Sequence, residues 1–259
     1  MSTVAEALPT LDLRETRRVP LSRLVRVELR KMSDTRAGMW LLIGIGVLTA
    51  GIMTIFFINA EQADRTFENF MAIAASPQAF LLPVLGILLV TSEWTQRTAL
   101  VTFTLEPVRF RLLAAKMIAA LLFGLAAVVL ALVIAAVATA LGGSEGAWNN
   151  VGFDEVGKYG LLQASSIVQG LAFGLVFLNS AGAIATFFVL PAAFGIVTSL
   201  WKVLADIGPW IDINTASGPL LEVENLTGEE WAHFAVATLL WVVLPLIVGI
   251  FRVLRKELK

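Results

Sequence analysis

The residues of this sequence best suited to chemistry lie in two short polar stretches separated by a few apolar residues. The first, Ser92–Thr98, reads Ser-Glu-Trp-Thr-Gln-Arg-Thr, and the second, Leu105–Arg111, combines a glutamate, a proline and two arginines. Carboxylates and guanidinium groups at this density form charge-assisted hydrogen bonds, which suits contact with another protein surface. Val101, Phe103 and Leu105 are apolar and need a surface to cover them. Two interpretations stay open: a solvated connector, or a short helix that lies on a partner.

A basic segment, Leu21–Arg36, has the spacing of an amphipathic helix. At about 100° per residue its leucines, Val25 and Met32 share one arc, and three arginines lie opposite. We expect this helix to lie along a membrane surface, with its arginines toward lipid phosphates or a partner. Glu28 falls inside the apolar arc, where a carboxylate is costly unless it is paired. It either reaches water at the edge of the helix or forms a salt bridge to another segment. The charged residues of interest are Arg23, Arg26, Glu28, Arg30 and Lys31.

Several kinds of catalytic and binding chemistry are excluded. The chain has no cysteine and one histidine, which rules out thiol catalysis, cysteine-ligated zinc and a multi-histidine metal site within one chain. No Gly-x-x-x-x-Gly-Lys-Ser/Thr phosphate loop, nucleophile elbow or His-Glu-x-x-His motif occurs. We therefore predict no catalytic residue, no metal site, no cofactor bound by this chain and no nucleic-acid partner.

The composition indicates which elements must position the polar segments. Of the 259 residues 58% are hydrophobic and only 15% are charged, too few to cover a soluble protein of this size. The apolar residues gather in six runs, each close to or longer than the roughly 20 residues with which a helix crosses a bilayer. Because backbone groups in lipid must pair internally, these runs predict helices. They cover about 39–58, 71–91, 112–141, 161–178, 181–200 and 232–251.

The distribution of positive charge predicts the orientation of these spans. Most of the 19 Lys and Arg residues fall in residues 1–38, in the segment 97–116 and at the C-terminus. Positive charge marks cytoplasmic loops, and six spans with both ends inside place all three segments on one side. The predicted fold is an all-α integral membrane protein with six transmembrane helices, both termini cytoplasmic, preceded by an amphipathic interfacial helix. We expect residues 1–20 to form a mobile cytoplasmic tail and residues 21–259 to form a single transmembrane domain.

Three features refine the prediction for the connections and the second span. The turn Asn179–Gly182 is so short that the fourth and fifth spans should form an antiparallel hairpin. Pro77 fits the start of the second helix, and Pro83 fits a kink in its interior. The segment 201–231 is long and acidic, and it forms either a solvated outer cap or short helices that dip back toward the membrane.

The fourth span carries residues that favour contacts between helices. Ser166, Gly170 and Gly174 are four residues apart and form a stripe that lets another helix approach closely. We expect this stripe to pack within the bundle rather than at a subunit interface. Gln163 and Gln169 are among the few polar residues in the spans, and we expect their side chains to bond neighbouring helices.

Taken in order, these segments resemble the membrane permease subunit of type-2 ABC transporters, the ABC-2 family common in bacteria. The resemblance covers residue 20 to the end of the chain. It rests on the six-span layout with both ends inside and on four stretches, which are Leu24–Lys31, Ser92–Thr98 with Glu106-Pro107-Val108-Arg109, Ala115-Lys116 and the basic ending Phe251–Lys259. It implies a half-transporter, in which two membrane subunits pair and two separate ATPase subunits dock beneath them.

The resemblance also implies partners and residue roles. The entry helix would be the interfacial helix, and the loop would be the coupling element pressed into a cleft of the ATPase through Glu93, Arg97, Thr98, Glu106, Pro107, Arg109 and Arg111. The partners would be an ABC ATP-binding subunit, which holds ATP and magnesium, a second permease copy or paralogue, and the lipid bilayer. The chain itself would have no enzyme activity. The expected function is ATP-driven export across the bacterial cytoplasmic membrane, and the alternative is a non-transporting membrane scaffold or assembly factor.

Overall fold

The computed structural model describes residues 18–149, 152–201, 204, 206–222 and 225–256, so residues 1–17 of the predicted tail lie outside the described residues. Within these ranges all regular structure is helical. The elements are α1 (Leu21–Asp34), α2 (Arg36–Asn59), η2 (Gln62–Asp64), α3 (Phe67–Thr95), α4 (Ala99–Leu105), α5 (Arg109–Gly142), α6 (Phe153–Phe177), α7 (Ser180–Leu200), α9 (Gly208–Ile211), α10 (Ile213–Glu222), α11 (Gly228–Thr238), η3 (Leu239–Val243) and α12 (Leu244–Arg255).

Six helices are long and apolar enough to cross a membrane, and each coincides with one of the predicted runs, except that α6 ends one residue before its run does. They are α2, α3, α5, α6, α7 and the continuous helix Gly228–Arg255, which α11, η3 and α12 build together. The predicted number and place of the spans are therefore confirmed. The helices extend beyond the apolar runs, since α5 has 34 residues and α3 has 29. These six helices are the signature of a multi-pass membrane protein.

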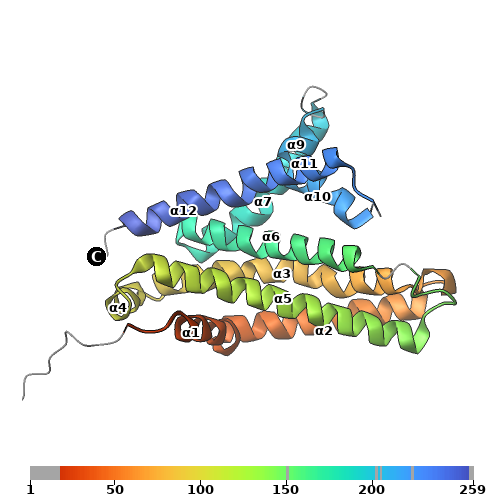
Figure 1. Cartoon of the computed structure of the whole chain (residues 1–259), viewed down its shortest axis with the longest axis horizontal. Coiled ribbons are helices and arrows are strands. Elements are labelled where there is room, and N and C mark those ends of the chain that lie inside the picture. Colours follow the sequence, from red (N-terminus) through yellow and green to blue (C-terminus); the bar gives the residue numbers. More distant parts are fainter. Residues whose placement is uncertain (1–17, 150–151, 202–203, 205, 223–224, 257–259) are drawn as a thin grey trace, which may run out of the picture.

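The bundle is built around α3. Figure 1 shows α2, α3 and α5 side by side with α6 above them, and α12 lying along α6. The main core joins all of these helices through residues such as Ile45, Leu85, Leu113, Leu171 and Val253. By contrast, α2 and α7 are mostly exposed and carry large apolar side chains on their surface. An apolar exposed surface of this kind is what a helix needs toward lipid.

The small-residue stripe of α6 packs against α3, as predicted. A Cβ added to Gly170 would overlap the carbonyl oxygen of Pro83, and one added to Gly174 would lie 3.1 Å from the carbonyl oxygen of Ile87. The approach is mutual, because a Cβ on Gly86 of α3 would lie 2.7 Å from the carbonyl oxygen of Ile167. Only glycine at these positions allows the two backbones to come so close.

Both prolines of the second span lie inside α3. The helix begins at Phe67, after Thr66 caps it by accepting a hydrogen bond from the backbone N–H of Asn69 at 3.3 Å. The prediction that Pro77 starts the helix is wrong. The helix begins ten residues before Pro77, and its first turn is capped and more polar than the rest. The apolar run alone did not include that turn.

Each proline removes one backbone donor, and a serine donates in its place. Pro77 and Pro83 lack the N–H groups that would bond the carbonyls four residues earlier. The hydroxyl of Ser76 donates to the carbonyl of Ile73 at 3.2 Å. The hydroxyl of Ser166, from α6, donates to the carbonyl of Ala79 at 3.4 Å. Neighbouring helices and serine side chains commonly satisfy such carbonyls in membrane helices.

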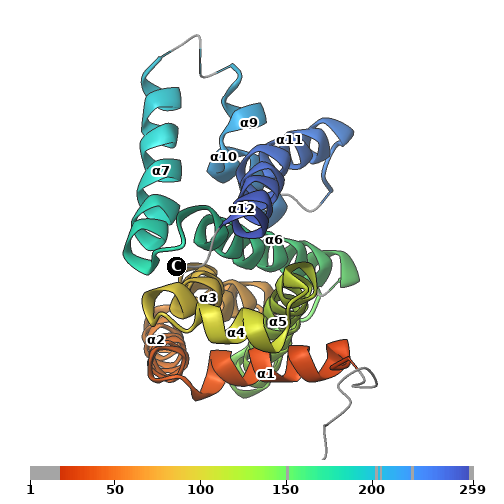
Figure 2. The ribbon, with the colours of Figure 1, turned by 90° about the vertical axis from the view of Figure 1, so that its left-hand side faces the viewer.

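The short link between α6 and α7 forms as predicted, but the helices do not stay together. Leu178 takes a left-handed conformation (φ 54°), and Asn179 then caps α7 by accepting from the N–H of Gly182 at 2.9 Å. α7 then rises from α6 at a steep angle and projects from the bundle, so the antiparallel hairpin predicted for these two spans does not form (Figures 1 and 2). The space between α7 and α6 is occupied in part by α10, which contacts both helices.

The segment after α7 folds back as short helices. Asp212 is buried and begins α10, accepting hydrogen bonds from the N–H groups of Asn214 and Thr215. Ala216 and Leu220 of α10 are almost fully buried. The indole N–H of Trp241 donates to the carbonyl of Ile211 at 2.7 Å and ties this segment to η3. Of the two predicted alternatives for 201–231, the segment therefore contains short helices that pack on the bundle.

Several segments far apart in the sequence gather at one end of the bundle, which we call the α4 end. It holds α1, α4, the C-terminal end of α12 and the α6–α7 turn, at the left of Figure 1. Figure 2 shows that α1 lies across this end rather than along the bundle. The α2–α3 and α5–α6 connections lie at the opposite end.

Candidate functional site

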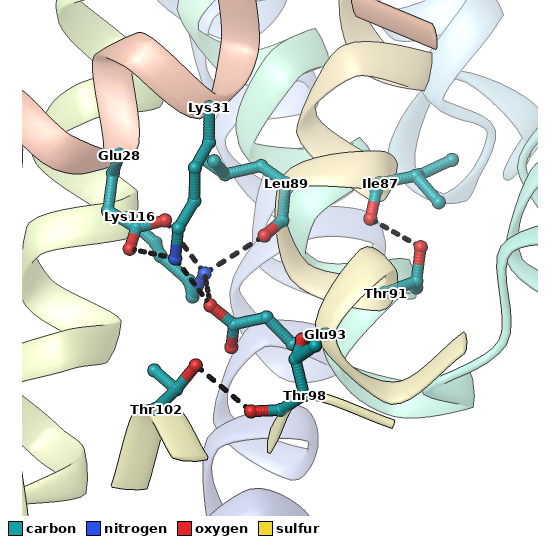
Figure 3. A network of polar contacts seen from close by, with 9 residues as sticks. All are labelled: Glu28, Lys31, Ile87, Leu89, Thr91, Glu93, Thr98, Thr102 and Lys116. Carbon is teal, nitrogen blue, oxygen red and sulfur yellow. Dashed lines mark hydrogen bonds and ion pairs between the residues drawn. The ribbon is translucent and has the colours of Figure 1, made fainter. Parts of the chain in front are cut away.

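The α4 end holds a buried network of charged side chains from three helices. Glu28 of α1, Glu93 of α3 and Lys116 of α5 are each at least nine-tenths buried, and Lys31 of α1 is partly buried. Figure 3 shows the four side chains pointing toward one another. Two carboxylates and two ammonium groups balance in charge, which is the condition for holding ions inside a protein.

Lys116 is the hub of this network. Its ammonium donates to Glu28 Oε2 at 2.8 Å, to Glu93 Oε1 at 2.9 Å and to the backbone carbonyl of Leu89 at 3.0 Å. A lysine has three N–H donors, so each donor has one acceptor. This single side chain therefore fastens α1 and α3 to α5.

Lys31 closes the network from the outer side. Its ammonium donates to Glu28 Oε1 at 2.8 Å and to Glu93 Oε1 at 2.7 Å. Burial of the ammonium lowers its pKa, but attraction to the carboxylates of Glu28 and Glu93 outweighs this and raises the pKa of Lys31. The lysine is therefore fully charged at neutral pH. The spacing of Glu28 and Lys31 by three residues lets one helix supply both signs.

The local backbone places Glu93 and α4. Arg97 adopts a left-handed conformation (φ 57°) two residues after α3 ends. The N–H of Thr98 then bonds the carbonyl of Glu93 at 2.9 Å, and the N–H of Arg97 bonds the carbonyl of Trp94 at 3.3 Å. This is the Schellman pattern of helix ends, here with arginine in place of the usual glycine. It turns the chain directly into α4.

A second ion pair holds the start of α5. Arg111 Nη1 lies 3.2 Å from Glu106 Oε2, and Glu106 is buried. The same guanidinium donates through Nη2 to the backbone carbonyl of Val19. The link between α4 and α5 is thus fastened to the residues that lead into α1.

Arg109 fastens the C-terminal end of α12. Its Nη1 donates to the carbonyls of Val253 and Lys256, both at 2.8 Å, and to that of Leu254 at 3.1 Å. The last carbonyls of a helix lack internal partners and carry a partial negative charge, so a guanidinium stabilises them. The same guanidinium lies 5.1 Å from the centre of the Phe103 ring. One side chain therefore links α4, α5 and α12.

The outward side of α4 is apolar. Ala99 and Phe103 are buried against the bundle, whereas Leu100, Val101 and Leu105 are 54%, 58% and 76% exposed. On the inner side, the ring of Phe103 packs against Trp94 and under the guanidinium of Arg109, so the exposed apolar residues belong to a helix that is held against the bundle. An exposed apolar patch with a polar surround is typical of a protein-interaction surface.

The predicted site residues fall into two groups. Glu28, Lys31, Glu93, Glu106, Arg109 and Arg111 make contacts within the chain, as described above. The exposed residues are Arg23, Arg26, Arg30, Arg97, Thr98 and Pro107. Of the two interpretations of Glu28, the salt bridge to another segment holds. The sequence predicts that Glu93 and Glu106 contact a partner protein, but both side chains are buried inside this chain. Both carboxylates form ion pairs within the chain instead.

Two features of the site were missed in the sequence. Lys116 was not among the candidate residues, although it is the only charged residue of α5 beyond its first turn and lies in an apolar run. That isolation is the signal by which it could have been found. Leu100 was also missed, since apolar residues in a short helix give no sign of which side is exposed.

No protein-family model matches this chain, and no characterised protein matches its sequence. Among the described residues, no three His, Asp or Glu side chains gather in a way that would hold a metal ion. The site contains fixed ion pairs and an exposed apolar helix. Such an arrangement can transmit a mechanical contact from a partner into three membrane helices.

Proposed function

We propose that this chain is the membrane-spanning permease subunit of an ATP-driven ABC-2 transporter, an exporter of the bacterial cytoplasmic membrane. The α4 end would face the cytoplasm, and a separate ATPase subunit would bind and hydrolyse ATP. The observation that carries the proposal is α4, a helix with an exposed apolar side that packs on the bundle through Ala99 and Phe103 and is flanked by the ion pair of Glu106 with Arg111. The order of motifs in the sequence supports it.

The contacts around α4 supply a route for coupling. α4 follows α3 directly, and Glu93 at the end of α3 is bonded to α1 and α5. Arg109, at the start of α5, is bonded to the end of α12. A force on α4 from a closing ATPase would therefore reach four helices at once. Such a contact can bias a bundle between two arrangements when it favours one of them.

The position of α1 supports its proposed role as the interfacial helix. It lies across the α4 end, with Arg23, Arg26 and Arg30 exposed. Val25 and Met32 are buried on the other side against the bundle. Exposed arginines at that level suit lipid phosphates of the inner leaflet.

Copurification tests the proposal. The tagged chain, extracted from its native membrane in mild detergent, should carry a second protein that photoazido-ATP labels and that hydrolyses ATP. Leu105→Asp should reduce the associated ATPase at least about tenfold, because a carboxylate would be buried in an apolar contact. Leu141→Asp is the matched control, since Leu141 is 78% exposed but lies at the opposite end of the bundle. It should leave the association unchanged.

Three outcomes would count against the proposal. The first is a wild-type chain that carries no ATP-binding protein, and the second is full transport by the isolated chain without ATP. The third is equal association of the ATPase with the Leu105→Asp and Leu141→Asp variants, which would remove α4 from the contact. A partner that binds at α4 but does not bind ATP would instead support the scaffold alternative.

A further inference from the structure

A second polar feature lies away from the α4 end, in a cavity of about 640 Å³ between α3, α6, α7, α10 and α11. Its volume is in the range of pockets that hold small molecules. The cavity exists because α7 splays from α6 and α10 folds back between them. None of the contacts at the α4 end involves its lining.

Two glutamines of α6 line this cavity and are left without partners. Gln163 and Gln169 are each 6% exposed, and the Nε2 atom of each has no hydrogen-bond partner among the described residues. The sequence-based expectation that they bond neighbouring helices is therefore wrong for these donors. A buried amide without a partner destabilises a fold, so two such amides in one cavity point to a ligand that pairs with them.

The rest of the lining limits what that ligand can be. Its other polar groups are neutral, such as those of Tyr159, Asn214 and Ser217, and none of the described residues that line it is Asp, Glu, Lys, Arg or His. A charged head group would have no counter-charge there. Phenylalanines from α3, α7 and α11 supply a large apolar surface. The lining therefore fits an apolar body with uncharged oxygen acceptors.

The cavity reaches the surface between α3 and α7. Phe80 and Phe188 both line it and are 62% and 38% exposed. In a membrane-spanning bundle this opening faces lipid, from which an amphiphile can enter sideways. The other large cavity, of about 560 Å³ between α2, α3 and α5, has a more apolar lining. It contains one buried hydroxyl without a partner among the described residues, that of Thr49.

We infer that the cavity between α3, α6 and α7 is a binding site for a neutral amphiphile, whose ester, amide or hydroxyl oxygens accept hydrogen bonds from Gln163 and Gln169. A diacylglycerol has this chemistry. As a binding site the inference stands on the cavity alone. Only the further step, that the amphiphile is the exported cargo, rests on the proposed function.

The test uses a diacylglycerol that carries a photoreactive diazirine in one acyl chain. The purified full chain is placed in phosphatidylcholine nanodiscs without any ATPase, so the result is independent of the transport proposal. Labelling should be saturable, should map to peptides from 72–80 and 159–169, and should be displaced by unlabelled diacylglycerol. Hexadecane and phosphatidic acid should not displace it.

Variants identify the donors. Gln163→Met with Gln169→Met keeps the side-chain lengths and should weaken the apparent affinity about tenfold, the effect of losing two neutral hydrogen bonds. Thr49→Val is the matched control, since it removes a buried unpaired hydroxyl from the other cavity. It should leave labelling unchanged. Even if the double variant does not fold, displacement of the photoreactive probe by unlabelled diacylglycerol on the wild-type chain still tests the binding site.

Three results would overturn the inference. One is labelling that does not saturate or that hexadecane displaces equally, which would show ordinary contact with lipid tails. Another is unchanged affinity in the folded glutamine variant. The third is occupation by a second copy of the chain, seen as a disulfide-linked dimer of Phe80→Cys together with loss of labelling. The chain has no native cysteine, so any such dimer would form through the introduced residue.

Discussion

At the scale of single residues, Lys116 shows how one charge can organise an apolar helix. Its ammonium has three acceptors, from α1, from α3 and from a backbone carbonyl. The ion pairs bring no large net stability by themselves, because removing ions from water costs about as much as their attraction returns. Their effect is on geometry, since a displaced α1 would take Glu28 away from Lys116 and leave one of the three donors of this buried ammonium without its acceptor.

Replacing Lys116 alone should therefore lower the free energy of unfolding far more than replacing Lys116 and Glu28 together. Lys116→Met leaves Glu28 and Glu93 buried with only Lys31 between them, and we expect a loss of about 3–5 kcal/mol in the free energy of unfolding. Adding Glu28→Met should restore most of it, because Lys31 and Glu93 remain paired at 2.7 Å. Titration with sodium dodecyl sulfate, followed by helical circular dichroism, measures both.

Arg26→Met, an exposed site on α1, is the control and should change stability by no more than about 0.5 kcal/mol. If the double variant were as unstable as Lys116→Met alone, the charge network would not set the position of α1.

At the scale of elements, the contact of α3 with α6 joins the two most buried spans of the bundle. It depends on glycines in both helices and on the serine hydroxyl that satisfies the carbonyl left free by Pro83. α6 also contributes Gln163 and Gln169 to the cavity, and it packs against α12. A change in the spacing of α3 and α6 would therefore alter the cavity as well as the bundle.

Gly170→Ala should separate α3 and α6. The added methyl would overlap the backbone of Pro83, which cannot rotate away, so we expect a destabilisation of about 1–3 kcal/mol. Gly160→Ala is the control in the same helix, because a Cβ there meets nothing within 4 Å. It should be neutral or stabilising by up to about 1 kcal/mol, as expected from helix propensity. Equal unfolding midpoints in detergent for the two variants would show that the helices are not closely packed.

At the scale of the whole molecule, the described segments of strongest positive charge meet at the α4 end. α1, the start of α5 and the end of α12 lie there together, and the connection with Glu61 and Asp64 lies at the opposite end. The bundle thus agrees with the separation of charge in the sequence. We propose that the α4 end is the cytoplasmic one, because the positive-inside rule assigns the more basic end to that side.

Single cysteines test that orientation, since the natural chain has none. Leu105→Cys at the α4 end should react with a membrane-impermeant maleimide only after the cells are permeabilised. Gln62→Cys, exposed at the opposite end, should react in intact cells. Reaction of both from the same side of the membrane would contradict the proposed orientation.

The number and place of the six spans could be predicted, because apolar length alone decides whether a helix can cross a bilayer. The role of Gly170 could be predicted too, since four-residue spacing of small residues has a physical meaning in any helix. The extent of α3 could not, because its first turn depends on the cap at Thr66 and not on apolarity. Nor could the burial of Glu93, since a carboxylate in a polar stretch gives no sign of a lysine on another helix.

Six apolar helices with most of their charge near the ends can be read from the amino-acid sequence, because hydropathy and charge are local properties that act on each segment separately. Which charges pair, which side of α4 remains exposed and which glutamine donors lack partners depend instead on how the helices pack together. Those properties depend on groups up to 147 residues apart, such as the guanidinium of Arg109 and the carbonyl of Lys256 that it bonds. The separation of two such residues along the chain does not indicate their distance in the folded protein.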